Sequence, residues 1–206
     1  MVYSAIILAG GSGTRFGNEK KQFFEFEGKM LYEHVLDKVL TIVDRNHVIV
    51  VGVDVPGGKT RSYSVMNGLN ALPSDTEKLI ILEAARPLVT VKQIKDILEC
   101  DGDSISYVMP CVNTAIYRNG TYINRNDLYD LLVPQCFNFK KLKAAYDTGK
   151  YTDYTDETRI MFDEYSIKPK FIETGQNLYK VTYKRDIAVL ESFNELMKEG
   201  KIWKEY

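Results

Sequence analysis

Short apolar runs that alternate with amphipathic segments are the feature that most restricts the fold of this chain. Residues 3–8, 47–53, 78–82 and 105–109 are rich in β-branched residues and are bounded by turn residues. Runs of this kind are typical of strands that are buried on both faces of a parallel sheet. The intervening segment 30–43 carries apolar residues at close to helical spacing, which predicts a βαβ unit.

Further helical patterns occupy residues 63–72, 91–98, 139–146 and 186–197, and residues 170–173 resemble a late short strand. Alternating strands and helices predict an α/β fold, with a Rossmann-like, doubly wound and mostly parallel sheet. In such a sheet, ligands bind at the carboxyl ends of the strands.

Residues 114–124 interrupt this alternation. Two short apolar stretches flank Asn119-Gly120, a dipeptide typical of hairpin turns. We therefore expect a single domain over residues 1–206 with a protruding β-hairpin arm at 111–126. Because an isolated hairpin is only marginally stable in water, the arm is expected to pack against something, and a homodimer formed through it is the natural candidate.

Composition narrows the class of protein and its partners. The formal net charge is −1, so no general attraction to nucleic acid or to acidic membranes is expected. The three cysteines include no CxxC pair, which argues against a disulfide framework or a structural zinc site. Without a secretory leader or a run of membrane-spanning length, a cytoplasmic protein with no membrane partner is expected.

A glycine-rich loop follows the first predicted strand. Gly10, Gly11 and Gly13 allow backbone N–H groups to approach an anion, and Arg15 and Lys21 add positive charge where the loop ends. Neither the Lys-Ser/Thr pair of a P-loop nor the third glycine of a dinucleotide fingerprint is present. The glycines alone are equally consistent with a tight turn, whereas the two cations favour a triphosphate site.

Further motifs follow in a fixed order along nearly the whole chain. They are Gly57-Gly58-Lys59-Thr60-Arg61-Ser62-Tyr63-Ser64-Val65, Glu83-Ala84-Ala85-Arg86-Pro87, Asn124-Arg125 with Leu128-Tyr129, Pro134-Gln135-Cys136-Phe137, Thr155-Asp156-Glu157 and Lys180-Val181-Thr182. With the glycine loop, they resemble the cytidylyltransferases that act on methylerythritol phosphate and on polyol phosphates such as ribitol phosphate. The resemblance implies transfer of CMP from CTP to a small phosphorylated acceptor, with release of pyrophosphate.

The resemblance also implies a role for each matching residue. Positions that neutralise charge in the reaction are Arg15, Lys21 and Lys180. Positions that bind CTP are Ala9, Gly10, Gly11, Ser12, Gly13, Gly58, Lys59, Arg61, Ser64 and Ala84, of which Gly58, Lys59, Arg61 and Ser64 would line the base pocket. Positions that bind the acceptor are Arg86, Thr114 and Arg125, the last two from the partner subunit's arm. Glu83 would hold Mg²⁺.

The chain departs from the family pattern at several points. Glu83 replaces the usual metal-binding Asp, Val133 replaces a Thr, and a segment before Gly57 is missing. Because the acceptor end is altered more than the CTP end, we expect a polyol or sugar phosphate used in cell-surface polysaccharide or teichoic-acid-type synthesis. Two alternatives stay open: a 2-C-methyl-D-erythritol 4-phosphate cytidylyltransferase of non-mevalonate isoprenoid synthesis, and a catalytically impaired nucleotide-binding homologue.

Overall fold

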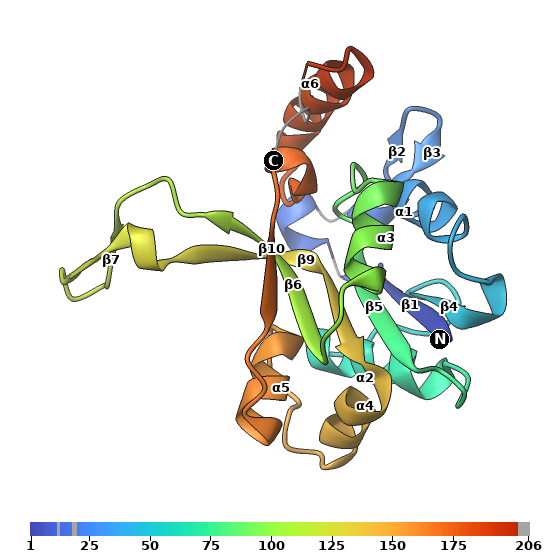
Figure 1. Cartoon of the computed structure of the whole chain (residues 1–206). Coiled ribbons are helices and arrows are strands. Elements are labelled where there is room, and N and C mark those ends of the chain that lie inside the picture. The colour runs from blue at the N-terminus through green and yellow to red at the C-terminus, as the bar shows by residue number, and fades with distance from the viewer. Residues whose placement is uncertain (12, 18–19, 202–206) are drawn as a thin grey trace.

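A six-stranded sheet forms the centre of the molecule (Figure 1). The computed structural model describes residues 1–11, 13–17 and 20–201. The strands lie in the order β10-β6-β9-β5-β1-β4, and every pairing is parallel except the two made by β9. Their bounds are β1 Tyr3–Leu8, β4 Val48–Val51, β5 Lys78–Glu83, β6 Ser104–Pro110, β9 Tyr129–Asn138 and β10 Lys170–Glu173. The predicted mostly parallel α/β fold is confirmed.

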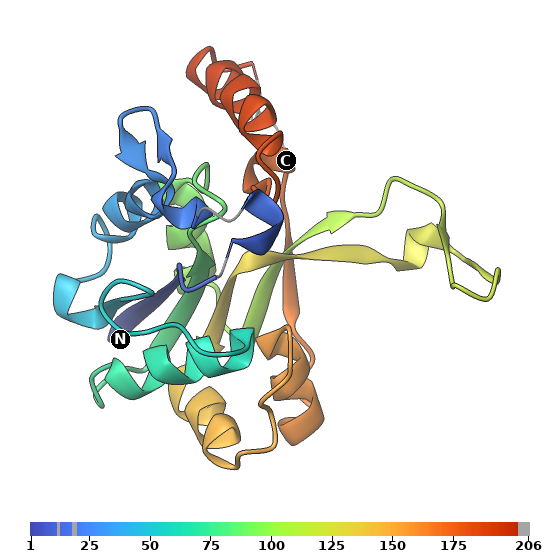
Figure 2. The same cartoon turned by 180° about the vertical axis from the view of Figure 1, so that it is seen from behind.

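Helices cover both faces of this sheet, as a doubly wound fold requires (Figures 1 and 2). Successive strand residues point to opposite faces, so Ile7 and Ile80 pack with helices α1 and α3, while Ile6 and Ile81 pack with α2, α4 and α5. The helix bounds are α1 Leu31–Val39, α2 Arg61–Ala71, α3 Val91–Glu99, α4 Phe139–Asp147, α5 Glu157–Tyr165 and α6 Asp186–Lys198.

Some expected elements differ in extent, and others were not predicted. Helix α1 ends at Val39 rather than at residue 43, and β4 is shorter than the predicted 47–53. The central strand β9 and the helix α5 were not predicted, and neither was the small hairpin of β2 (Glu25–Phe26) with β3 (Lys29–Met30). Pro134 concealed β9, because proline is rare in central strands except at bulges. The β6–β9 register shifts there, passing from Ser106 opposite Gln135 to Tyr107 opposite Leu132.

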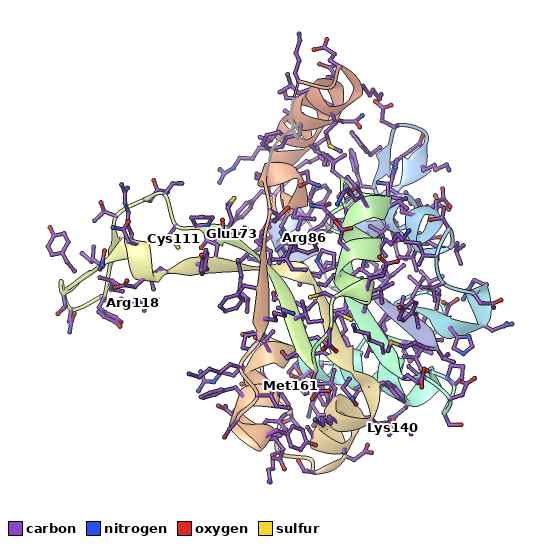
Figure 3. The ribbon with its side chains drawn as sticks, viewed as in Figure 1. Arg86, Cys111, Arg118, Lys140, Met161 and Glu173 are labelled. Carbon is purple, nitrogen blue, oxygen red and sulfur yellow. The ribbon has the colours of Figure 1, made fainter. Side chains whose placement is uncertain are left out.

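The hairpin predicted within 114–124 is present as β7 (Ala115–Ile116) paired with β8 (Tyr122–Ile123). It lies at the end of an arm that projects from the sheet and that β6 and β9 join to the body (Figure 1). Figure 3 shows Arg118 near the outer end of this arm and Arg86 in the body of the molecule. The arm exposes several large apolar side chains, namely Val112, Ile116, Tyr117 and Tyr122.

A third apolar cluster attaches α6 to the segment that follows the glycine loop. Phe16 and Val181 are both buried there, together with Leu190 of α6. Phe16 and Val181 directly follow Arg15 and Lys180 in sequence, so the packing holds two predicted cation-bearing segments next to each other. Among the helices of the described residues, none has the length and apolar character needed to cross a membrane.

Candidate nucleotide-binding site

A cavity of about 520 Å³ opens at the carboxyl ends of β1 and β5, where ligands bind in folds of this type. It brings together most of the residues predicted to bind CTP or to act in the reaction. These are Ala9, Gly10, Gly11, Arg15, Lys21, Gly58, Lys59, Arg61, Ser64, Glu83, Ala84 and Lys180. Segments far apart in the sequence therefore converge on one hollow, which we call the nucleotide cavity.

The two glycine motifs contact each other in the wall of the nucleotide cavity. A Cβ added to Gly10 would lie 2.8 Å from the Cα of Gly57, and one added to Gly57 would lie 2.8 Å from the carbonyl oxygen of Gly10. Real Cβ atoms essentially never approach backbone so closely. The sequence interpretation assigned Gly10 to the approach of an anion, whereas the structure gives it a packing reason as well.

The first turn of α2 also lines the nucleotide cavity. Thr60 caps this helix, since its side chain accepts a hydrogen bond from the N–H of Tyr63. The Oγ of Ser64 accepts a hydrogen bond from the N–H of Gly58 at 3.0 Å and so fixes the turn before the helix. The ammonium group of Lys59 lies 4.6 Å from the centre of the Tyr63 ring.

The carboxylate of Glu83 lies among three cations at the floor of the nucleotide cavity. Its Oε1 accepts a hydrogen bond from Lys180 at 2.9 Å, and its Oε2 accepts one from Nε of Arg86 at 3.2 Å. The Nε of Arg61 lies 3.9 Å from Oε1. Burial acts to raise the pKa of Glu83, but Lys180 and Arg86 outweigh it and lower the pKa to about 2. Glu83 is therefore ionised at neutral pH.

A second buried carboxylate, Glu157, holds Arg61 in place. The Nη1 of Arg61 lies 2.6 Å and 2.7 Å from the two carboxylate oxygens, and the hydroxyl of Tyr146 donates to Oε1 at 2.9 Å. Although burial works against the charge of Arg61, Glu157 raises its pKa above the usual range. Glu157 was quoted only as part of a motif, and its role was missed because the contact spans 96 positions of sequence.

Lys21 enters the nucleotide cavity from the glycine-loop side. Its ammonium group donates to the carbonyl oxygen of Val181 at 2.8 Å, and the side chain of its neighbour Gln22 donates to the carbonyl oxygen of Gly11 at 3.2 Å. Burial and the nearby charge of Lys180 lower the pKa of Lys21 to about 8. Gln22 also lines the cavity and was not among the predicted residues.

The remaining predicted residues lie elsewhere. Ser12 lies outside the described residues, and Gly13 adopts φ 71° at the start of a short 3₁₀ helix without lining the cavity. Arg86 lies beside the floor, with its Nη1 donating to the carbonyl oxygen of Leu178. Thr114 and Arg125 lie on the arm, where Arg125 is exposed and donates to the carbonyl oxygen of Val112 at 2.5 Å.

The residues around Glu83 fit a magnesium ion that arrives with a nucleotide better than a resident metal. Within residues 1–11, 13–17 and 20–201, no cluster of three or more His, Cys, Asp or Glu side chains could hold a metal. Mg²⁺ that is bound mainly by phosphate oxygens and water needs only one or two carboxylates. Glu83 can supply one, because each of its oxygens keeps a lone pair beyond those used by Lys180 and Arg86.

Comparison with known proteins identifies the family. The model of the 2-C-methyl-D-erythritol 4-phosphate cytidylyltransferase family matches residues 3–195. The chain belongs to this family. An enzyme of that name from Thermotoga neapolitana is 31% identical over 211 residues, which cover 90% of this chain and 93% of the relative. A second, from Clostridium botulinum strain Langeland, is 29% identical over 93% of this chain and 97% of the relative.

Solved structures of the family share the fold. The bifunctional IspDF from Campylobacter jejuni superposes with a TM-score of 0.81 at 24% identity, covering 93% of this chain and 55% of that one. The 4-diphosphocytidyl-2C-methyl-D-erythritol synthase from Anaerococcus prevotii gives a TM-score of 0.79 at 21% identity, covering 94% of this chain and 96% of that one. At this level of identity the likeness concerns the fold.

Membership of the family makes the chain a CTP-dependent cytidylyltransferase, which is a nucleotidyltransferase, as predicted. The expected preference for a polyol phosphate of teichoic-acid-type synthesis is not supported. The family match and the relatives favour the alternative, a methylerythritol-phosphate enzyme. The expectation of a polyol rested mainly on departures from the family pattern at the acceptor end, and these proved weaker evidence than similarity along nearly the whole chain.

Proposed function

We propose that this protein transfers CMP from CTP to 2-C-methyl-D-erythritol 4-phosphate in a magnesium-dependent reaction, and so takes part in isoprenoid synthesis. The observation that carries the proposal is the meeting of the glycine loop, the start of α2 and the Glu83–Lys180–Arg86 cluster in one cavity. Two relatives that are named for this activity match the chain over at least nine-tenths of its length and of their own.

The chemistry requires positioning and charge neutralisation more than proton transfer. A phosphate oxygen of the acceptor forms a bond to the α-phosphorus of CTP, while the bond from that phosphorus to the oxygen bridging to the β-phosphorus breaks. The electron pair leaves with pyrophosphate. The acceptor phosphate is already largely dianionic at neutral pH, so the cavity needs no general base. Mg²⁺ bound with the triphosphate would supply further positive charge beside Glu83.

Each cation of the nucleotide cavity has a distinct task in this proposal. Lys21 and Arg15 stabilise charge on the triphosphate from the segment that follows the glycine loop, and Lys180 does so from the neighbouring segment that precedes α6. Gly58 and Ser64 border the space for the cytosine. Lys180 also contacts the carboxylate of Glu83, so binding of the triphosphate must compete for the same ammonium group.

Arg86 is placed to grip the acceptor phosphate beside the floor of the cavity. Thr114 and Arg125 cannot reach the cavity of their own subunit from the arm, which projects away from it (Figure 1). We propose that they act in the neighbouring subunit of a homodimer. Mixing an inactive Lys21→Ala subunit with an inactive Arg125→Ala subunit should then restore activity, because one hybrid site carries neither substitution. A mixture with no more activity than its components argues against this arrangement.

The test of the main proposal is an acceptor panel. Pyrophosphate release is measured with CTP, Mg²⁺ and one acceptor at a time: 2-C-methyl-D-erythritol 4-phosphate, erythritol 4-phosphate, ribitol 5-phosphate and glycerol 3-phosphate. The proposal expects the highest kcat/KM with the first. Preference for ribitol 5-phosphate would restore the polyol alternative, which Asn124-Arg125 and Leu128-Tyr129 favour by resemblance. Tight CTP binding without release from any acceptor would favour the impaired homologue.

A further inference from the structure

A second hollow of about 540 Å³ lies against the outer side of the nucleotide cavity, between the segment carrying Arg15 and the start of α6. We call it the basic groove. Arg15 and Lys180 line both hollows, so the two adjoin at these side chains. The groove is further lined by Thr182, Tyr183 and Arg185, none of which borders the nucleotide cavity.

The charge of the basic groove suits an anion. Arg15 and Arg185 are exposed, and within the described part of the chain neither forms a salt bridge with a carboxylate. The guanidinium of Arg185 stacks over the ring of Tyr183 at 4.8 Å, which restrains this otherwise flexible side chain.

The carboxylate of the groove lining, Asp186, accepts its hydrogen bonds mainly from the backbone, and the charge of Arg185 contributes less to its lowered pKa than these bonds do. Its Oδ2 accepts hydrogen bonds from the N–H groups of Thr182 and Tyr183 at 2.7 Å and 2.8 Å, and Asp186 is buried. Asp186 thus shapes the turn that presents Arg185, and its own charge is largely satisfied by those donors.

We infer that the basic groove receives inorganic pyrophosphate as it leaves, with Arg185 as a further cation that binds it. The inference rests on the proposed function for the source of the pyrophosphate. Phosphoryl-transfer reactions place the attacking and leaving oxygens roughly in line, on opposite sides of the phosphorus. Arg86, the residue proposed to bind the acceptor, does not line the groove, whereas Arg15 and Lys180 line both the groove and the nucleotide cavity, so a leaving group held by these two cations adjoins the groove. Negative charge that builds up on the leaving pyrophosphate is therefore met by the cations of the groove. The pyrophosphate can then leave without passing back through the base pocket.

Inhibition by added pyrophosphate tests this role in the Arg185→Ala protein. The Ki for pyrophosphate is expected to rise about fivefold, as for loss of one charged contact at an exposed site, and by more than the KM for CTP. Arg185→Lys should recover part of the loss, and the effect should shrink at high salt because exposed charges are screened. Lys92→Ala is the matched control: Lys92 is an exposed helical cation on α3 with a single ion pair, to Asp96.

Three results would overturn the inference. An unchanged Ki removes Arg185 from pyrophosphate binding. An equal rise in the Ki for pyrophosphate and the KM for CTP means that the groove holds the β- and γ-phosphates of bound CTP instead. A selective rise in the KM of the acceptor assigns the groove to the acceptor. If wild-type protein transfers CMP to no acceptor, the proposed function fails, and calorimetric titration of inorganic pyrophosphate into wild-type and Arg185→Ala protein still tests the groove on its own.

Discussion

Replacing Glu157 by glutamine tests whether a buried carboxylate fixes the geometry of the nucleotide cavity. Glu157 is fully buried and accepts from both Arg61 and Tyr146. Glutamine keeps the size of the side chain but removes the charge, leaving Arg61 with only the more distant Glu83 at 3.9 Å. Breaking one partner of a buried ion pair costs roughly 3 kcal/mol. For a domain of this length, the melting temperature should fall by roughly 6–12 °C.

The same change should weaken nucleotide binding, because Arg61 lines the cavity and loses the contact that holds it there. We expect the KM for CTP to rise about tenfold, as for one lost charge-assisted contact. Thermal unfolding and initial-rate kinetics on the same preparation measure both effects. Tyr146→Phe is the matched control, since it removes a single hydrogen bond to the same carboxylate and should cost about 1.5 kcal/mol.

The reasoning is refuted if Glu157→Gln unfolds within about 1 kcal/mol of wild type, because a buried arginine then tolerates the loss of its partner. It is also refuted if the protein loses stability while the KM for CTP stays the same. That result would mean that Glu157 supports only the packing of α5 and α4, and that Arg61 keeps its position without it.

Three further predictions concern the same cavity. Gly57→Ala should lower the free energy of unfolding in urea by about 1–3 kcal/mol, because the new Cβ would meet the backbone of Gly10. Gly11→Ala should lower it far less, because a Cβ there meets nothing within 4 Å. Equal losses of stability would contradict the packing argument. The kcat/KM for CTP should fall as the pH rises through about 8, the pKa of Lys21, and Lys21→Arg should move that fall to higher pH. If wild type and Lys21→Arg show the same pH profile of kcat/KM, Lys21 is excluded as the source of the fall. Since the pKa of Glu83 is lowered to about 2, its carboxylate should contribute about 3 kcal/mol to the free energy of unfolding above pH 4.5, and this contribution is lost as the pH falls towards 2. The free energy of unfolding of Glu83→Gln should therefore depend less on pH in that window. An unchanged pH dependence would contradict the ion-pair cluster.

The parts of the fold that the sequence predicted are those with local patterns. The apolar runs of β1 and β5 and the helical spacing of α3 are visible within a few residues, so their positions agree closely with the structure. Strand β9 was missed because its bulge places Pro134 where a regular central strand would exclude it. Helix α5 was missed because its motif was taken as a site marker rather than as the start of a helix capped by Asp156.

The candidate site shows the same division. The placement of residues such as Lys21 and Glu83 in the cavity could be predicted, because each lies within a motif of an ordered series that resembles the family. The contact between Gly10 and Gly57 and the ion pair of Arg61 with Glu157 join segments that only the folded chain brings together. No local pattern reports such a pairing, so the supporting partners of the site emerge from the structure alone.

The arrangement of charges explains why a chain with a net charge of −1 can bind a triphosphate at one place. Glu83 neutralises much of the charge of Lys180 and Arg86, so the cations can be partly buried without facing one another unpaired. A triphosphate that enters the cavity must displace part of this pairing, and its own charge would repel Glu83. A magnesium ion bound to the phosphates would turn that repulsion into attraction, because Glu83 could then serve as a metal ligand and Lys180 would be free to bind phosphate. The same carboxylate that neutralises Lys180 and Arg86 would therefore make nucleotide binding depend on the metal.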